Sequence, residues 1–221
     1  MNVADIVIRG GTDPCLRDRV FLLSRQDSGE VLSVTYGELY ARSLAYGALI
    51  DALRREQGIA PPSRFHVGVF MQNIPEFFFL LFGCAFTNAT LVGVNNAQVG
   101  EKLAFDINNI DMHVLVADHA PQPGTDGTFL DTVLRARDQF GFTALKDGAI
   151  LVVDPPSGEP PAGACPLSRR LAESKEPAAS FQPEPLDVSR PGVIIFTSGT
   201  TGAPKGIEVT WQKLYDTGVT G

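Results

Sequence analysis

The sequence predicts an α/β protein with a mainly parallel sheet that helices flank on both faces. Four short runs, at residues 66–71, 91–94, 113–117 and 149–153, are almost wholly apolar, as strands buried on both faces are. Segments with helical spacing of apolar residues separate these runs, and such alternation is typical of parallel sheets. From residue 65 to residue 100 the chain carries one formal charge, at Glu76, so this stretch belongs in a core.

Composition narrows the class of protein before any motif is considered. The chain has 221 residues, of which 44% are hydrophobic and 19% charged, a balance typical of folded domains. Its net charge is -7 at pH 7 and no segment is densely basic, which argues against binding to nucleic acid. Cys15, Cys84 and Cys165 lie far apart in the sequence, as expected of free thiols in a reducing compartment.

The sequence gives no sign of a metal centre, a secretory signal or a membrane span. His66, His113 and His119 match no zinc-binding pattern, and we expect them to be structural. Asp5 interrupts the first apolar stretch and no basic segment precedes it, unlike a signal peptide. The most apolar run, at residues 77–86, is about half of the roughly 20 residues that a span needs. We expect a cytoplasmic protein; a peripheral membrane contact stays open.

The first predicted helix spans residues 36–57. Thr35 is placed to cap its N-terminus, and Glu38, three residues later, completes a capping box. Gly58 and the prolines that follow it end the segment. The polar face of this helix is expected to carry Arg42, Arg54 and Arg55.

A second helix is predicted after the strand at residues 66–71, because Pro75 suits the first turn of a helix. Phe78, Phe82 and Phe86 recur at every fourth position, which places them on one face. We expect this stripe to pack in the core; an acyl-binding pocket or a lipid contact is the alternative. Two more helices are predicted at residues 100–110 and 129–139.

The organisation changes after residue 153. Nine of the 16 prolines fall within residues 154–191, and such a segment cannot pair inside a sheet. We expect a long surface connection with one short helix at residues 167–174. The chain is therefore divided into an α/β N-terminal subdomain (1–153), a proline-rich connection (154–191) and a strand with a loop that begins the next subdomain (192–221).

The segment that carries chemistry follows a short apolar strand at residues 193–196. Its ten residues, 197–206, read TSGTTGAPKG and hold three glycines, four hydroxyl side chains and Lys205. Glycines let the backbone approach a ligand closely, and successive N–H groups in such a loop converge on an anion. The loop therefore predicts a polyphosphate site. It is no Walker A motif, because Gly206 stands where that motif has Ser or Thr, and a strand-like run follows it instead of a helix.

This loop resembles the phosphate-binding signature of the adenylate-forming superfamily, also called AMP-binding enzymes. That superfamily includes acyl-CoA synthetases, the adenylation domains of nonribosomal peptide synthetases, and luciferases. Other segments resemble family segments in the same order: TYGEL at 35–39, MQNIPEF at 71–77, LVGVNN at 91–96 and HVLVAD at 113–118. The resemblance implies that the chain is the N-terminal portion of the family's large domain.

The resemblance also implies a reaction and its residues. In this family a carboxylate attacks the α-phosphate of ATP, pyrophosphate leaves, and the thiol of coenzyme A or of a carrier protein then displaces AMP. The β- and γ-phosphates would be held by Ser198, Gly199, Thr200, Thr201 and Gly202. Lys205 would be the catalytic cation that neutralises the departing pyrophosphate, and Thr197 would help to hold Mg²⁺.

The acid is harder to infer from the sequence. NNAQVGEKL at residues 95–103 is similar to a segment of very-long-chain, fatty-acid-transport-type acyl-CoA synthetases, so a fatty acid is favoured over an aryl, short-chain or amino acid. A non-catalytic ATP-binding or partner-docking module is the alternative from another class. Family members are more than twice as long, so we expect the 221-residue chain to be inactive alone. A homodimer stays open.

Overall fold

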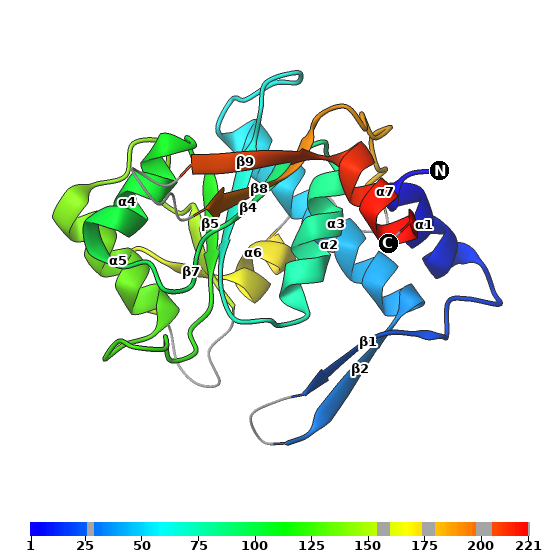
Figure 1. The fold of residues 1–221 in the computed structure, drawn as a ribbon, viewed down its shortest axis with the longest axis horizontal. Helices are drawn as coiled ribbons and strands as arrows, with labels where there is room; N and C mark the ends of the chain where they lie inside the picture. The colour runs from blue at the N-terminus through cyan, green and yellow to red at the C-terminus, as the bar shows by residue number, and fades with distance from the viewer. Residues whose placement is uncertain (26–28, 154–159, 174–179, 198–204, 221) are drawn as a thin grey trace.

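In a computed structural model, which describes residues 1–25, 29–153, 160–173, 180–197 and 205–220, a twisted sheet crosses the middle of the molecule (Figure 1). The sheet has seven strands in the order β7-β6-β5-β3-β4-β8-β9, and all neighbours are parallel except β8 and β9. The strands are β3 (His66–Phe70), β4 (Thr90–Gly93), β5 (Val114–Ala117), β6 (Ile150–Val152), β7 (Cys165–Pro166), β8 (Pro191–Thr197) and β9 (Lys205–Thr210).

Helices cover both faces of this sheet, as the sequence predicts. One face packs against α1 (Val3–Thr12), α2 (Tyr36–Glu56), α3 (Glu76–Phe86), α6 (Leu167–Glu173) and α7 (Trp211–Thr220). The other face packs against α4 (Gly100–Asn109) and α5 (Phe129–Phe140). Side chains alternate along each strand: Val67 and Val69 of β3 enter the first core, whereas Phe70 enters the second. The predicted α/β architecture is confirmed.

The predicted capping box starts α2. The Glu38 amide donates to Thr35 Oγ1 at 3.2 Å, and the Thr35 amide donates to Glu38 Oε2 at 2.8 Å. The predicted polar face is wrong at Arg54, which is only 6% exposed, because its guanidinium is taken up by an internal ion-pair network. Arg42 is exposed, as predicted, and its guanidinium lies 5.3 Å from the centre of the Phe79 ring.

The phenylalanine stripe of α3 is divided between the core and its margin. Phe86 is fully buried, whereas Phe78 and Phe82 are half-buried. Both half-buried rings meet Phe21 of β1 (Val20–Arg25) edge to face, with ring centres 5.4 and 6.3 Å apart. The prediction that the stripe packs in the core is therefore correct for Phe86 and partly correct for Phe78 and Phe82.

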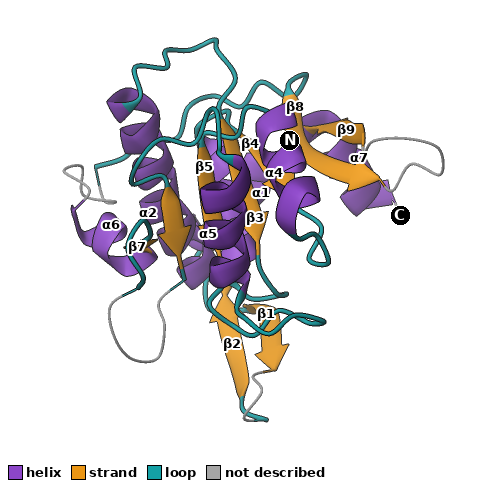
Figure 2. Cartoon of the chain, turned by 90° about the vertical axis from the view of Figure 1, so that its left-hand side faces the viewer, coloured by secondary structure: helices purple, strands orange, loops and turns teal. Residues whose placement is uncertain are grey.

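Two strands near the N-terminus form a separate antiparallel hairpin that the sequence did not predict. β1 (Val20–Arg25) pairs with β2 (Val31–Thr35), and the pair projects from the rest of the molecule (Figures 1 and 2). Helices α1 and α7 were also not predicted. After residue 153, α6 and β8 fall where the sequence places them, and β8 joins the main sheet beside β4. The division into 1–153, 154–191 and 192–221 stays a prediction.

Candidate active site

The sheet has a topological switch point between β3 and β4. The chain leaves β3 toward α3 on one face and leaves β4 toward α4 on the other, so the two exit loops diverge at the carboxyl ends of the strands. Open α/β sheets bind ligands in the crevice that such divergence creates. A cavity of about 450 Å³, which we call the carboxyl-end pocket, lies here, lined in part by Met71, Asn73, Asn95, Asn96 and Phe196.

Side-chain amides fix the loops that form this pocket. Asn96 Nδ2 donates to the Met71 carbonyl oxygen at 2.8 Å, which ties the β4 exit to the β3 exit. Gln122 Nε2 donates to the Asn96 carbonyl oxygen at 2.8 Å, and Gln122 is only 2% exposed. The rim is thus held by direct hydrogen bonds, which makes it a preorganised wall for a ligand.

Asp118 links the exits of β3 and β5. Its side chain is almost fully buried; Oδ1 accepts from the Ala120 amide at 2.9 Å and Oδ2 from the Gln72 amide at 3.4 Å. His119 Nδ1 lies 3.8 Å from Asp118 Oδ1. These contacts give Asp118 a role in shaping the loops, and the sequence showed only that it ends a strand.

The structure places two of the predicted site residues opposite each other, and one of them, Thr197, is next in the chain to Phe196, which lines the pocket. Thr197 is the last residue of β8 and Lys205 the first of β9, and the two are partners in the strand register. Thr197 Oγ1 donates to the Lys205 carbonyl oxygen at 3.4 Å, and both side chains are exposed. The predicted residues Ser198, Gly199, Thr200, Thr201 and Gly202 lie outside the described residues.

The β8–β9 pair is held firmly against its neighbours. A Cβ added at Gly206 would lie 2.9 Å from Ile110 Cδ1 and 3.0 Å from Ile194 Cγ2, so β9 approaches closely because this residue lacks a side chain. Glu208 forms an ion pair with Arg64, which precedes β3. Thr197 and Lys205, which flank residues 198–204, therefore lie in fixed positions.

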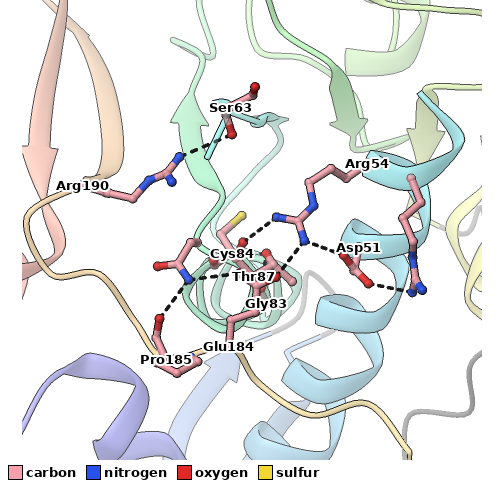
Figure 3. A network of polar contacts seen from close by, with 11 residues as sticks. Asp51, Arg54, Ser63, Gly83, Cys84, Thr87, Glu184, Pro185 and Arg190 are labelled. Carbon is pink, nitrogen blue, oxygen red and sulfur yellow. Dashed lines mark hydrogen bonds and ion pairs between the residues drawn. The ribbon is translucent and has the colours of Figure 1, made fainter. Parts of the chain in front are cut away.

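A polar network fixes the other end of β8, where the chain enters the sheet (Figure 3). Arg54 Nη2 contacts Asp51 Oδ1 at 2.7 Å and Glu184 Oε1 at 2.8 Å, and Arg54 Nη1 donates to the Thr87 carbonyl oxygen at 3.3 Å. Asn88 Nδ2 donates to Glu184 Oε2 at 3.2 Å and to the Pro185 carbonyl oxygen at 3.1 Å. Burial by itself would lower the pKa of Arg54, but the hydrogen bonds that Arg54 donates to Glu184 and Asp51 outweigh it and raise the pKa.

Two histidines lie at the same end of the sheet. The His66 amide donates to His113 Nδ1 at 3.1 Å, and the His113 ring stacks on Phe65 with centres 5.0 Å apart. Burial, and to a smaller extent the neighbouring His66, lowers the pKa of His113 to about 4. Burial also lowers the pKa of His66. Both rings are neutral at pH 7 and lie far along the strands from the carboxyl-end pocket.

Thr197 and Lys205, the predicted site residues that the structure describes, carry groups that can bind the phosphates of a nucleotide. Lys205 offers a cation and Thr197 a hydroxyl beside an open cavity. Within the described residues there is no group of three or more His, Cys, Asp or Glu that could hold a metal ion.

Two further observations concern features outside the candidate site. In the part that the structure describes, no helix has both the length and the apolar character to cross a bilayer. Cys15, Cys84 and Cys165 are free thiols, as their spacing predicts, and burial raises the pKa of Cys84.

Comparison with known proteins places this site in a family. The family model described as "AMP-binding enzyme" matches residues 15–220. The chain therefore belongs to the AMP-binding enzymes, and its resemblance to CoA ligases of this group is confirmed.

Curated relatives carry the names of CoA ligases. The chain is 32% identical over 180 residues to a steroid-22-oyl-CoA synthetase of Rhodococcus jostii, covering 81% of this chain and 27% of that protein. It is 29% identical over 182 residues to a medium/long-chain-fatty-acid–CoA ligase of Mycobacterium marinum, covering 82% of this chain and 30% of that protein. The chain thus spans about a third or less of the length of these relatives.

A solved structure shares the fold. The crystal structure of the anthranilate CoA ligase AuaEII in complex with anthranoyl-AMP superposes with a TM-score of 0.73 over 96% of this chain and 35% of that one, at 19% sequence identity. At this identity the likeness supports the fold alone.

Proposed function

We propose that the protein is part of an acid–CoA ligase, which activates a carboxylic acid with ATP and transfers the acyl group to coenzyme A. The observation that carries this proposal is the TSGTTGAPKG segment, whose ends lie at the carboxyl edge of a parallel sheet beside a cavity of about 450 Å³. Relatives in two bacteria are named as CoA ligases, which supports the same reaction class.

The roles of the residues follow from where charge develops. As the carboxylate attacks the α-phosphate, negative charge gathers on the departing pyrophosphate, and Lys205 would stabilise it there. The backbone and hydroxyls of residues 198–202 would hold the β- and γ-phosphates. The Thr197 hydroxyl would help to hold Mg²⁺, which would neutralise part of the negative charge of the phosphates.

A fatty acid is the substrate that we favour. The NNAQVGEKL segment and a long- or medium-chain ligase among the relatives support it. An aryl acid is the second candidate, because the sequence leaves the acyl group open; the fold shared with an anthranilate CoA ligase is compatible with either acid. Relatives named for steroid, carnitine and acetyl substrates show how widely the acid varies among similar chains.

The test is acid-dependent exchange of pyrophosphate into ATP, followed by AMP release on addition of coenzyme A. In a protein that carries this sequence at the length of its relatives, we expect exchange with fatty acids to exceed exchange with benzoate, anthranilate and amino acids. Exchange with aryl acids alone would favour the second candidate. Mg-ATP binding without exchange for any acid would instead indicate a non-catalytic module.

The 221-residue chain by itself should bind Mg-ATP and release no AMP. The described site forms one wall of a pocket, and positioning of reactants accounts for about 7–11 kcal/mol of a reaction barrier. AMP release on the order of 1 s⁻¹, an ordinary enzyme rate, would contradict this proposal and point to a site completed between copies of the chain.

A further inference from the structure

A second cavity lies between the projecting β1–β2 hairpin and the start of α3. It measures about 390 Å³, and we call it the hairpin groove. Its apolar lining comes from Leu22 and Leu23 of β1 and from Ile74, Phe77 and Phe78 at the start of α3. The β1–β2 hairpin projects from the body of the molecule (Figures 1 and 2).

Aromatic contacts hold the groove open. Phe21 anchors the base of the hairpin, edge to face against Tyr36 and Phe78 with ring centres 5.4 Å away in each case. Farther along β1, Leu23 is 65% exposed, and Phe77 and Phe78 are half-buried. An apolar surface of this kind gains free energy when a ligand covers it.

One charged side chain lines the groove. Arg25, the last residue of β1, is exposed, and among the described residues that line the groove none is acidic. Arg25 also lines a neighbouring cavity of about 330 Å³, where Glu76 and Asp118 supply negative charge. An anion that enters from the groove therefore meets a guanidinium next to an apolar wall.

We propose that the hairpin groove binds an amphipathic carboxylic acid, with the carboxylate at Arg25 and the hydrocarbon along Leu22, Leu23, Phe77 and Phe78. The volume is in the range of small-molecule pockets, and a mainly apolar lining with a few polar groups, here Ser24, Arg25 and Asn73, is the usual composition of such sites. Arginine suits the head group because its planar fork matches a carboxylate. This site is distinct from the phosphate loop.

The groove adjoins the carboxyl-end pocket. Asn73 and Phe77 line both cavities, so a ligand in the groove lies one side-chain layer from the candidate active site. An acid held there would be stored next to the place where it is activated. The binding itself does not depend on the proposed activity, because it needs neither ATP nor coenzyme A.

The test is calorimetric titration of the 221-residue chain with dodecanoate, below its micelle concentration, and with dodecanol as the uncharged probe. We expect one dodecanoate site, with dodecanol about fivefold weaker, as a partly exposed ion pair gives. Arg25→Gln should lower the affinity for dodecanoate to that for dodecanol and leave the affinity for dodecanol unchanged. Arg19→Gln, an exposed arginine just before β1 that does not line the groove, is the matched charge control.

The apolar half of the site has its own variant. Leu23→Asn, at an exposed position, should weaken both ligands equally, and affinity should rise about two- to fourfold per added methylene until the groove is filled. Equal dodecanoate affinity in the wild type, Arg25→Gln and Leu23→Asn would place the ligand elsewhere and overturn the proposal. No dodecanoate binding, or self-association that blocks it, would overturn the proposal as well, the latter by assigning the groove to a second copy.

Discussion

The two edges of the parallel sheet are built in opposite ways. At the amino edge, where β3, β4, β5 and β8 begin, buried polar groups bond to one another: the Arg54 network, the His66–His113 pair, and Thr90 Oγ1, which donates to the Pro191 carbonyl oxygen at 2.9 Å. At the carboxyl edge, where the same strands end, a cavity opens beside the exposed side chains of Thr197 and Lys205.

This difference indicates that the amino edge contributes mainly to stability, whereas the exposed residues of the carboxyl edge contribute mainly to ligand binding. Bonds at the amino edge join segments that are distant in sequence, so their loss should be felt as a loss of folding free energy. At the carboxyl edge, Thr197 and Lys205 are exposed, where they can contact a ligand, and these two side chains should contribute little to folding. Asp118 and Gln122 are buried at the same edge and fix the loops around the pocket. Substitutions at the two edges can break or sharpen this comparison.

The largest expected effect is at Trp211, which is 1% exposed and packs over Gly192 at the amino edge. Trp211→Ala should lower the free energy of unfolding by about 3–5 kcal/mol, because it leaves a cavity under the start of β8. Ile195→Ala, near the carboxyl end of the same strand and 52% exposed, should cost under about 1 kcal/mol. Urea denaturation of both variants measures the contrast, and equal losses would contradict it.

The next effect is at Arg54. Arg54→Met should lower the free energy of unfolding by about 2–3 kcal/mol, because Asp51 and Glu184 would keep their charges without a partner; their partial exposure limits the cost. Arg55→Met is the matched control, since Arg55 is 58% exposed although it also pairs with Asp51. It should cost about 0.5 kcal/mol. If Arg55→Met lowered the free energy of unfolding as much as Arg54→Met, burial of Arg54 could not explain the effect.

A smaller effect is expected from pH. His113 has its pKa lowered to about 4 by burial, with a further contribution from the charge of His66, against about 6.5 in the unfolded chain. Below pH 6.5 the unfolded state binds the extra proton, so stability is full above that pH and falls as the pH drops toward 4. About 1–2 kcal/mol should be lost, since the ring is half-buried and water screens it. His113→Gln should reduce the fall of the urea midpoint between pH 7 and pH 5. An unchanged pH dependence of the midpoint would contradict the assignment of this effect to His113.

Sequence patterns predicted the middle of the molecule well, because each pattern there is local. The apolar runs at 66–71 and 113–117 and the Thr35–Glu38 capping box need no distant partner to be recognised. Helix α1 was missed because Gly10 and Gly11 weaken its helical signal. Both are needed, since added Cβ atoms would lie 2.4 and 2.3 Å from atoms of Tyr36 and Tyr40.

Other features could not be predicted because their partners lie far apart in the chain. The β1–β2 hairpin has apolar residues on both faces, so it lacks the alternation that marks a half-buried strand. Arg54 finds Glu184 after 130 residues, and a single arginine in a helix otherwise indicates a solvated face. The pairing of Thr197 with Lys205 follows from the loop itself, whereas the pocket beside them depends on β3 and β4.

The central claim is that the carboxyl edge binds a nucleotide through its phosphates, and Lys205 tests it most directly. Calorimetric titration of Mg-ATP into the chain should show Lys205→Ala weakened about 10- to 100-fold, as expected for loss of a charged hydrogen bond to phosphate. Lys213→Ala, an exposed lysine on α7, should bind as the wild type does, and both variants should unfold at the wild-type urea concentration. Equal Mg-ATP affinity in the two variants would contradict the account.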